Sequence, residues 1–217
     1  MTTIILTSTI NVNPNKSHLF QTDKNSRLET YLKSILQWLN KTNFYIILVE
    51  NSGYNYDELI QEKEIFKHRF EVITFIENEL EDAAYLKNNV SKGASEIFAI
   101  DYAFKHSRQN HSSNFIIKIT ARFFIAELEE YLTNFNLDEY DCLTQKNRKR
   151  CEMVGSHYKN FSNIFNIRLI NDNGKLDGHI ENIWESRTSK YNNILICKNF
   201  KIDTTQRGGV KQCYNYI

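Results

Sequence analysis

The sequence predicts an α/β protein with a mostly parallel central sheet flanked by helices, and three observations support this fold class. Apolar strand-like runs alternate with amphipathic helical segments along the first 120 residues. The runs are continuously apolar, which is typical of parallel strands buried on both faces. The 217 residues, of which 41% are hydrophobic and 24% charged, suffice for one domain with a substantial core. We therefore expect one domain over residues 1–217.

The N-terminal segment begins with a strand over 3–9, a β-branched apolar run that ends in hydroxyl residues. A polar loop is expected over 11–26. Residues 27–39 carry apolar side chains at helical spacing and predict a helix. The second strand, 44–49, is apolar throughout and stops at the turn-forming segment 50–53.

The alternation continues with a helix at 56–66, a strand at 70–76, a helix at 96–106 and a strand at 115–120. A fifth strand is expected at 140–144. Beyond residue 145 the pattern loosens, and it predicts short strands at 165–170 and 194–197 and a helix at 180–186. We find no internal repeat and no domain boundary.

Composition and charge exclude several classes of protein. A net charge of +1 gives no reason to expect a nucleic-acid partner. No apolar stretch is long enough to span a membrane, and the first residues lack the features of a signal peptide. The four cysteines include no C-x-x-C pair, so neither a zinc site nor a disulfide framework is expected. These features predict a cytoplasmic protein with free thiols.

Ligands of open parallel sheets bind beyond the carboxyl ends of the strands. This rule selects four segments of the sequence, which are 7–9, 50–52, 77–78 and 118–122. Hydroxyl and amide groups in the first two segments can hydrogen-bond a nucleobase and ribose without burying a charge. The same residues are also ordinary turn formers, so their ligand role and their turn role both stay open.

The order and spacing of five segments resemble a family of small GT-A glycosyltransferases. This family occurs in large DNA viruses, where it includes a chlorovirus rhamnosyltransferase domain, and in bacterial capsule and lipopolysaccharide loci. The similar segments are 27–35, 46–53, 92–104, 117–125 and 178–185. Their most specific parts are E-N-S after the second strand, K-G-x-x-E before a helix and K-x-T-x-R after the fourth strand.

The resemblance implies a GT-A-like, Rossmann-like fold that transfers a sugar from a nucleotide-diphosphate donor, expected to be a UDP-sugar, to an oligosaccharide or glycan acceptor. Residues 1–125 would bind the donor and residues 126–217 the acceptor. The expected location is the cytoplasm, which is the host cytoplasm if the protein is viral. The donor-binding residues expected on these grounds are Thr7, Ser8, Thr9, Arg27, Glu50, Asn51, Ser52, Lys92, Gly93, Glu96, Lys118, Thr120, Arg122, Arg207 and Gly209.

The fourth strand departs from a common feature of GT-A enzymes. Many of them carry Asp-x-Asp there and bind a divalent ion, whereas this chain has Lys118-Ile119-Thr120-Ala121-Arg122. Lysine and arginine do not ligate metals, but they can stabilise the negative charge of a leaving diphosphate. We therefore expect no required metal. If Mn²⁺ or Mg²⁺ is used, the acidic run 77–82 is the best source of ligands, although such runs are usually solvated loops.

A catalytic base is expected near residue 181. Inverting transfer needs a carboxylate or histidine that removes the proton of the acceptor hydroxyl. Glu181 is the first choice, with Asp177 and His179 as alternatives, although an acidic residue in a first helical turn is also ordinary capping chemistry. A catalytically inactive nucleotide- or glycan-binding module is the alternative function. A nuclease built on the acidic run is disfavoured by the near-neutral charge.

Overall fold

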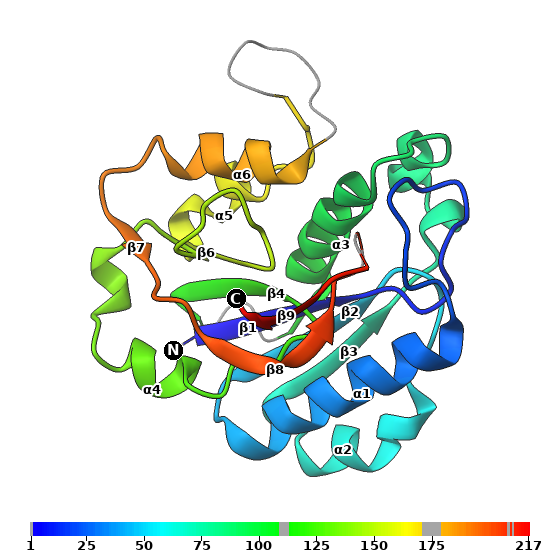
Figure 1. The fold of residues 1–217 in the computed structure, drawn as a ribbon, viewed down its shortest axis with the longest axis horizontal. Coiled ribbons are helices and arrows are strands. Elements are labelled where there is room, and N and C mark those ends of the chain that lie inside the picture. Colours follow the sequence, from blue (N-terminus) through cyan, green and yellow to red (C-terminus); the bar gives the residue numbers. More distant parts are fainter. Residues whose placement is uncertain (1, 109–112, 171–178, 208, 210) are drawn as a thin grey trace.

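The computed structural model describes residues 2–108, 113–170, 179–207, 209 and 211–217. In this part of the chain a seven-stranded sheet, in the order β3-β2-β1-β4-β6-β5-β7, forms the middle layer of a single domain (Figure 1). Every neighbouring pair is parallel except the two pairs that involve β6. The predicted mostly parallel sheet is therefore confirmed. The strands are β1 (Thr2–Ser8), β2 (Tyr45–Glu50), β3 (Phe70–Thr74), β4 (Phe115–Thr120), β5 (Cys142–Thr144), β6 (Met153–His157) and β7 (Ile194–Ile196).

Helices cover both faces of the sheet (Figure 1). One face carries α1 (Lys24–Lys41), α2 (Ile60–Ile65) and α4 (Leu128–Leu132), and the other carries α3 (Lys92–His106), α5 (Phe161–Ile164) and α6 (Ile180–Thr188). A hairpin of β8 (Lys201–Gln206) and β9 (Cys213–Tyr216) crosses the α1 side. Short 3₁₀ helices lie at Asp57–Leu59, Glu77–Glu79, Glu81–Leu86, Leu137–Glu139 and Tyr158–Asn160.

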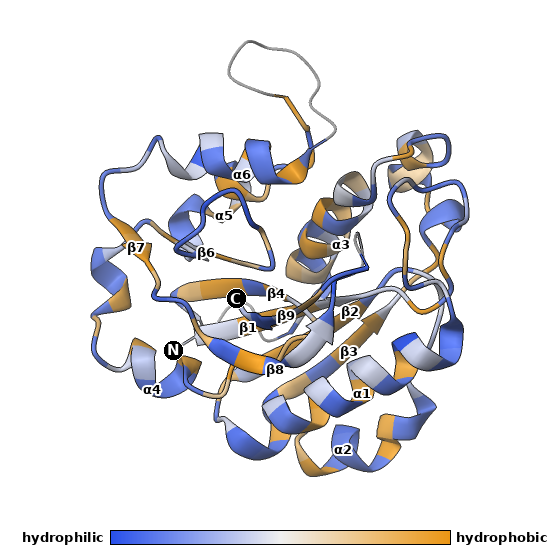
Figure 2. Ribbon diagram, viewed as in Figure 1, coloured by the Kyte–Doolittle hydropathy of each residue, from blue (hydrophilic) through white to orange (hydrophobic). Residues whose placement is uncertain are grey.

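The core consists of two apolar layers separated by the sheet. The first lies under α1, where Tyr31, Ile35 and Trp38 are buried, and the second lies under α3, α5 and α6. The central strands β1, β2 and β4 are apolar on both faces, whereas the helices are amphipathic (Figure 2). Because each fully buried large apolar side chain stabilises by about 1.5–3 kcal/mol, these two layers hold the strand ends in fixed relative positions.

Side-chain caps place the starts of the two long helices. Asp23 accepts a bond of 2.8 Å from the amide of Ser26 and starts α1 at Lys24, three residues before the predicted start. Ser91 caps α3 through the amide of Ala94 at 3.3 Å, so α3 begins at Lys92 rather than at residue 96. The cap consequently brings Lys92 and Gly93 into the first turn of a helix.

The C-terminal third differs most from prediction. Residues 165–170 do not form the expected strand, because Phe165 closes α5 through a bond from its amide to Phe161 O at 2.8 Å. Strand β6 was not predicted, since Gly155 and Ser156 interrupt its apolar run. It fits between β4 and β5 because a Cβ on Gly155 would lie 2.9 Å from Phe115 Cε1. The β8–β9 hairpin was also not predicted.

Among the described residues, no helix has the length and apolar character that a membrane crossing requires.

Candidate functional site

A cleft of about 1070 Å³ opens above the carboxyl ends of β1, β2 and β4. This is the edge of the sheet that the strand-end rule selected. Its wall also includes loop 11–19, the starts of α3 and α6, and part of the β8–β9 connection. The predicted site residues that line it are Thr7, Ser8, Thr9, Arg27, Asn51, Ser52, Lys92, Gly93, Glu96, Thr120, Arg122, His179, Glu181, Arg207 and Gly209.

The β2 and β3 end of the cleft is a network of neutral and charged hydrogen-bonding groups. Asn51 accepts from Thr9 Oγ1 at 2.6 Å and donates to Glu77 Oε2 at 3.0 Å. Glu77 is buried and also accepts from Ser95 Oγ at 2.8 Å, and it pairs with Lys16 at 3.2 Å. The acidic run 77–82 is thus divided, because Glu77 is part of the cleft wall while Glu79, Glu81 and Asp82 are exposed.

Glu50 does not line the cleft. Its carboxylate is fully buried and accepts bonds from the amides of Ile10, Ser52 and Tyr54 at 2.8–2.9 Å. The Ser52 hydroxyl also donates to it. Glu50 was expected to bind the donor, but these bonds favour a role in supporting the loop after β2. Gly53, with a φ of +81°, completes this turn after β2.

Two arginine guanidiniums meet at Tyr31 on the α1 side of the cleft. Arg27 NH2 and Arg122 NH2 donate to the Tyr31 hydroxyl at 2.8 and 3.3 Å, and both groups also bond Gln21. Each arginine is only 6% exposed. Burial lowers the pKa of Arg27, and the neighbouring Arg122 acts in the same direction. Within the described residues, neither guanidinium forms an ion pair with a carboxylate.

Lys118 lies beneath the cleft rather than in its wall. Its side chain is fully buried, and Nζ is 2.7 Å from Glu96 Oε1 and donates to Cys151 O at 2.7 Å. It also lies over the Trp184 ring of α6 at 5.0 Å. A direct bond from Lys118 to a diphosphate, as the sequence suggested, is not available in this arrangement because these partners enclose the ammonium. Arg122, two residues along the strand end, does reach the cleft.

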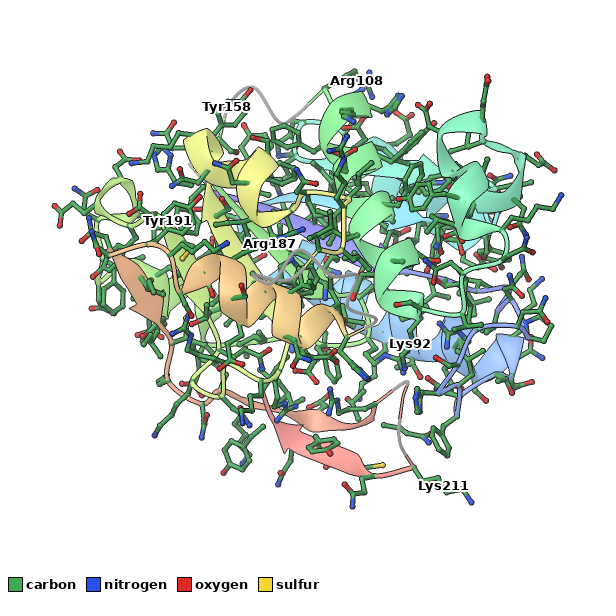
Figure 3. All side chains as sticks on the ribbon, turned by 90° about the horizontal axis from the view of Figure 1, so that it is seen from above. Lys92, Arg108, Tyr158, Arg187, Tyr191 and Lys211 are labelled. Atoms are coloured by element: carbon green, nitrogen blue, oxygen red, sulfur yellow. The ribbon has the colours of Figure 1, made fainter. Side chains whose placement is uncertain are left out.

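The first turns of α3 and α6 meet at the cleft. A Cβ on Gly93 would lie 2.7 Å from Ile180 Cβ, so glycine allows the two helices to approach this closely. Figure 3 shows one end of α6 beside Lys92, with Arg108 beyond the opposite end of α3. Lys92 donates to His18 O at 2.9 Å, and its pKa is lowered by desolvation despite its place at the rim. Two helix N-termini therefore point their positive ends toward one region.

The three residues considered as a base have different positions. Glu181 is partly exposed in the first turn of α6, and His179 precedes that helix; both line the cleft. Asp177 lies outside the described residues. Glu185, one turn further along α6, does not line the cleft and serves as a comparison for Glu181.

Arg207 connects the β8–β9 hairpin to the sheet. Its Nε lies 2.6 Å from Glu152 Oε1, and its guanidinium stacks on Tyr214 at 5.4 Å. Glu152 is 4% exposed; burial opposes its ionisation, but Arg207 and Arg150 hold its pKa below the usual value. Arg207 and Gly209 were both expected to bind the donor. In the structure Arg207 and Gly209 do line the cleft, with the Arg207 charge already paired.

The residues at the end of β4 do not fit a divalent metal. Where an acidic pair would supply oxygen ligands, this chain presents the ammonium of Lys118 and the guanidinium of Arg122. Among the described residues, no group of three or more His, Cys, Asp or Glu side chains is placed to hold a metal ion. We therefore derive no chemical step through a metal.

Several residues of the cleft were not predicted. Tyr31 was expected only as part of an apolar helix face, yet its hydroxyl joins the two arginines. Glu152 gave one weak signal, an acidic residue directly before an apolar pair. Lys16 and Gln21 lie in a polar loop with no motif, and no pattern in the sequence distinguishes them from solvated residues.

No model of a protein family matches the sequence, and no curated protein is significantly similar to it. Solved structures are similar in fold. One, assigned as a nucleotide-diphospho-sugar transferase from Desulfovibrio desulfuricans G20, has a TM-score of 0.50 and 14% identity, covering 91% of this chain and 79% of that one. The glycosyltransferase GlyE of Streptococcus pneumoniae TIGR4 has a TM-score of 0.52 and 6% identity, covering 90% of this chain.

S. aureus TarS (residues 1–349) has a TM-score of 0.50 and 12% identity, covering 90% of this chain. This chain spans 44% of the GlyE chain and 57% of the TarS chain. At these identities the comparisons establish the fold, which is the GT-A-like α/β architecture that the sequence predicted.

Proposed function

We propose that the protein is a glycosyltransferase that transfers a sugar from a nucleotide-diphosphate donor to a glycan. The observation that carries this proposal is the pair of buried guanidiniums at Tyr31, in a large cleft at the carboxyl edge of a GT-A-like sheet. Burying a charge without an opposite charge costs several kcal/mol, so a site of this kind is stabilised when an anion binds. A nucleoside diphosphate supplies that anion.

The cleft offers three kinds of group that match the parts of a nucleotide-diphosphate sugar. Thr9, Asn51 and Ser52 at the β1 and β2 ends suit the hydroxyls and amides of a nucleoside. Arg122, which follows β4, and Arg27 of α1, which meets it at Tyr31, suit the diphosphate, for which guanidinium forks are well matched. Lys92 and the first turns of α3 and α6 add positive potential at the same edge. Side-chain cations thereby take the role that a metal has in other transferases.

Glu181 is the proposed base for the acceptor hydroxyl. It lies where the first turn of α6 meets the first turn of α3, and it interacts electrostatically with Lys92. An acceptor that enters over α6 would place its hydroxyl between this carboxylate and the anomeric carbon, and attack in line with the leaving diphosphate would invert the configuration. His179, on the residue before α6, is the second candidate.

The finer features of the proposal come from the sequence. They are UDP as the nucleotide, transfer of a hexosyl or deoxyhexosyl group, inversion, a cytoplasmic location and kinship with viral or capsule-locus enzymes. The donor half at 1–125 and acceptor half at 126–217 belong to the same set. The cleft supports the first half as the main donor surface, although Arg207 and Gly209 also line it. An inactive binding module of the same fold remains the alternative and differs only in turnover.

Turnover in two matched variants tests the proposal. Hydrolysis of the donor sugar, and its transfer to added glycans, is measured for Glu181→Gln and for Glu185→Gln. A general base contributes about 10²- to 10⁴-fold, so we expect kcat to fall by that factor in Glu181→Gln with little change in the KM for the donor. Glu185→Gln should retain activity. Equal activity in both variants contradicts the assignment of the base, and binding of the donor without turnover in the wild type identifies a binding module.

A further inference from the structure

Glu96 is held in the cleft by bonds that all go to one of its two carboxylate oxygens. Oε1 accepts from Thr7 Oγ1 at 2.8 Å and from Thr120 Oγ1 at 3.4 Å, and it lies 2.7 Å from Lys118 Nζ. Among the described residues, no hydrogen bond or ion pair involves Oε2. The side chain is 22% exposed and lines the cleft. One oxygen is therefore fixed by the protein, and the other is free to accept from a ligand.

Lys118 determines how rigidly this carboxylate is held. Its ammonium is fully buried between Glu96, the Cys151 carbonyl and the Trp184 ring. A buried ammonium needs a carboxylate partner, and a charge-assisted bond at 2.7 Å restricts the rotamers of both side chains. This explains why a lysine lies inside an otherwise apolar strand.

The position of Glu96 points to the transferred sugar rather than to the nucleoside. Glu96 follows Gly93 by one helical turn, and Gly93 contacts Ile180, the neighbour of Glu181, so the two carboxylates lie at the same junction of α3 and α6. The nucleoside-like groups Asn51 and Ser52 lie at the end of β2 instead. Glu96 itself lies against the strand ends of β1 and β4, where Arg122 also reaches the cleft, so it is next to the proposed diphosphate site, to which the transferred sugar is attached.

We propose that Glu96 is a specificity-determining residue that accepts a hydrogen bond from a hydroxyl of the transferred sugar, with Lys118 as the positioning residue that orients it. This inference rests on the proposed function and deepens it. Because the free oxygen of Glu96 and the carboxylate of Glu181 can only accept hydrogen bonds, they favour a sugar hydroxyl, which donates, over a sugar carboxylate, which cannot. The donor class is thus a nucleotide-activated neutral sugar rather than a uronate.

The test is isothermal titration in EDTA with UDP, UDP-glucose, UDP-galactose, UDP-N-acetylglucosamine and UDP-glucuronate. In the wild type at least one neutral sugar should increase affinity over UDP, and the glucuronate should not. Glu96→Gln should bind that neutral donor about 10- to 100-fold more weakly than the wild type does, because a hydrogen bond to a charged acceptor is lost. Its Kd for UDP should stay within about twofold of the wild-type value. Asp101→Asn, on the same helix outside the cleft, is the matched control.

Lys118 is tested by rescue. Lys118→Met should lose the sugar-dependent affinity, and Lys118→Arg should restore part of it. Because Glu96→Gln leaves a buried cation without its partner, the double variant Glu96→Gln/Lys118→Met should recover the melting temperature but not the sugar-dependent affinity. A purely structural role would instead restore both together.

Three results overturn the inference. In the first, Glu96→Gln still binds the neutral UDP-sugar more tightly than UDP by the same factor as the wild type does. In the second, it weakens UDP and the UDP-sugar equally, which would assign the contact to ribose. In the third, UDP-glucuronate binds the wild type most tightly. Failure of the wild type to bind any of UDP, GDP and dTDP would overturn the proposed function as well, whereas normal UDP binding with any of the three results overturns only the role of Glu96.

Discussion

Replacing Arg122 by glutamine is expected to weaken nucleotide binding strongly without unfolding the protein. Arg122 donates to Gln21 Oε1 at 2.7 Å, to Gln206 O at 3.1 Å and to the Tyr31 hydroxyl at 3.3 Å. These partners are all neutral, so its charge is not needed to balance a carboxylate in the described part of the chain. Glutamine keeps a donor and an acceptor but removes the charge that we assign to the diphosphate.

The expected size of the effect follows from the bond that is lost. A hydrogen bond to a charged group contributes about 1.5–3 kcal/mol, which corresponds to a decrease in UDP affinity of about 10- to 150-fold. The effect on stability should be smaller, because removing one of two adjacent guanidiniums also relieves their repulsion at Tyr31. The free energy of unfolding should change by at most about 1 kcal/mol, within the range of a single neutral hydrogen bond.

Isothermal titration with UDP in EDTA measures the affinity, and thermal unfolding checks the fold. Lys149→Gln is the matched control, since it removes an exposed cation that does not line the cleft. A folded Arg122→Gln protein that binds UDP within twofold of the wild type would refute the assignment of the guanidinium pair to the diphosphate. A similar loss in Lys149→Gln would show that only the total charge matters.

Three further predictions concern pH and packing. Desolvation lowers the pKa of Lys92, so this side chain loses its charge at a lower pH than a free lysine does. The affinity for the donor should therefore fall as the pH rises into the alkaline range. Lys92→Arg should move this fall to higher pH, because arginine stays charged. The pKa of Glu152 is held below its ordinary 4.5 by Arg207 and Arg150 against the effect of burial, so its contribution to stability is complete above about pH 4.5 and is lost as pH falls through the lower folded value. At neutral pH the free energy of unfolding of Glu152→Gln should therefore be about 1–3 kcal/mol lower than that of the wild type, and its melting temperature lower accordingly. This difference should shrink on acidification, and a difference independent of pH would contradict the ion pair. Gly93→Ala should lose about 1–3 kcal/mol, because its Cβ would lie 2.7 Å from Ile180 Cβ. Gly93 is in the first turn of α3, where the advantage of alanine in a helix interior does not apply in full. A melting temperature equal to or above that of the wild type would show that α6 can move away without cost.

The strands of the first half were predictable because each is a short, continuous apolar run between polar turns. The end of β4 at Thr120 and the burial of both faces followed from that pattern alone. Helix starts were less accurate, because the caps Asp23 and Ser91 act through side-chain bonds that apolar periodicity does not report. Strand β6 is short and contains Gly155, so it depends on pairing with β4 and β5 rather than on its own sequence.

The cleft shows the same division between what a local pattern reports and what the fold creates. Strand-end residues such as Thr7 and Asn51 were predictable from the rule for parallel sheets. The direction of Lys118 was not, since a lysine in an apolar strand can point toward the cleft or toward a buried partner, and Glu96 is 22 positions away in the sequence. Tyr31 and Gln21 became part of the site only through the approach of α1 to the end of β4.

The most direct test of the central claim is titration of the wild-type protein with UDP in EDTA. The account predicts saturable binding of one nucleotide per chain, with an affinity that manganese changes little and that decreases in Arg27→Gln and Arg122→Gln. Binding that requires manganese would contradict the role of the guanidinium pair, and the absence of binding of UDP, GDP and dTDP under both conditions would contradict the proposed function itself.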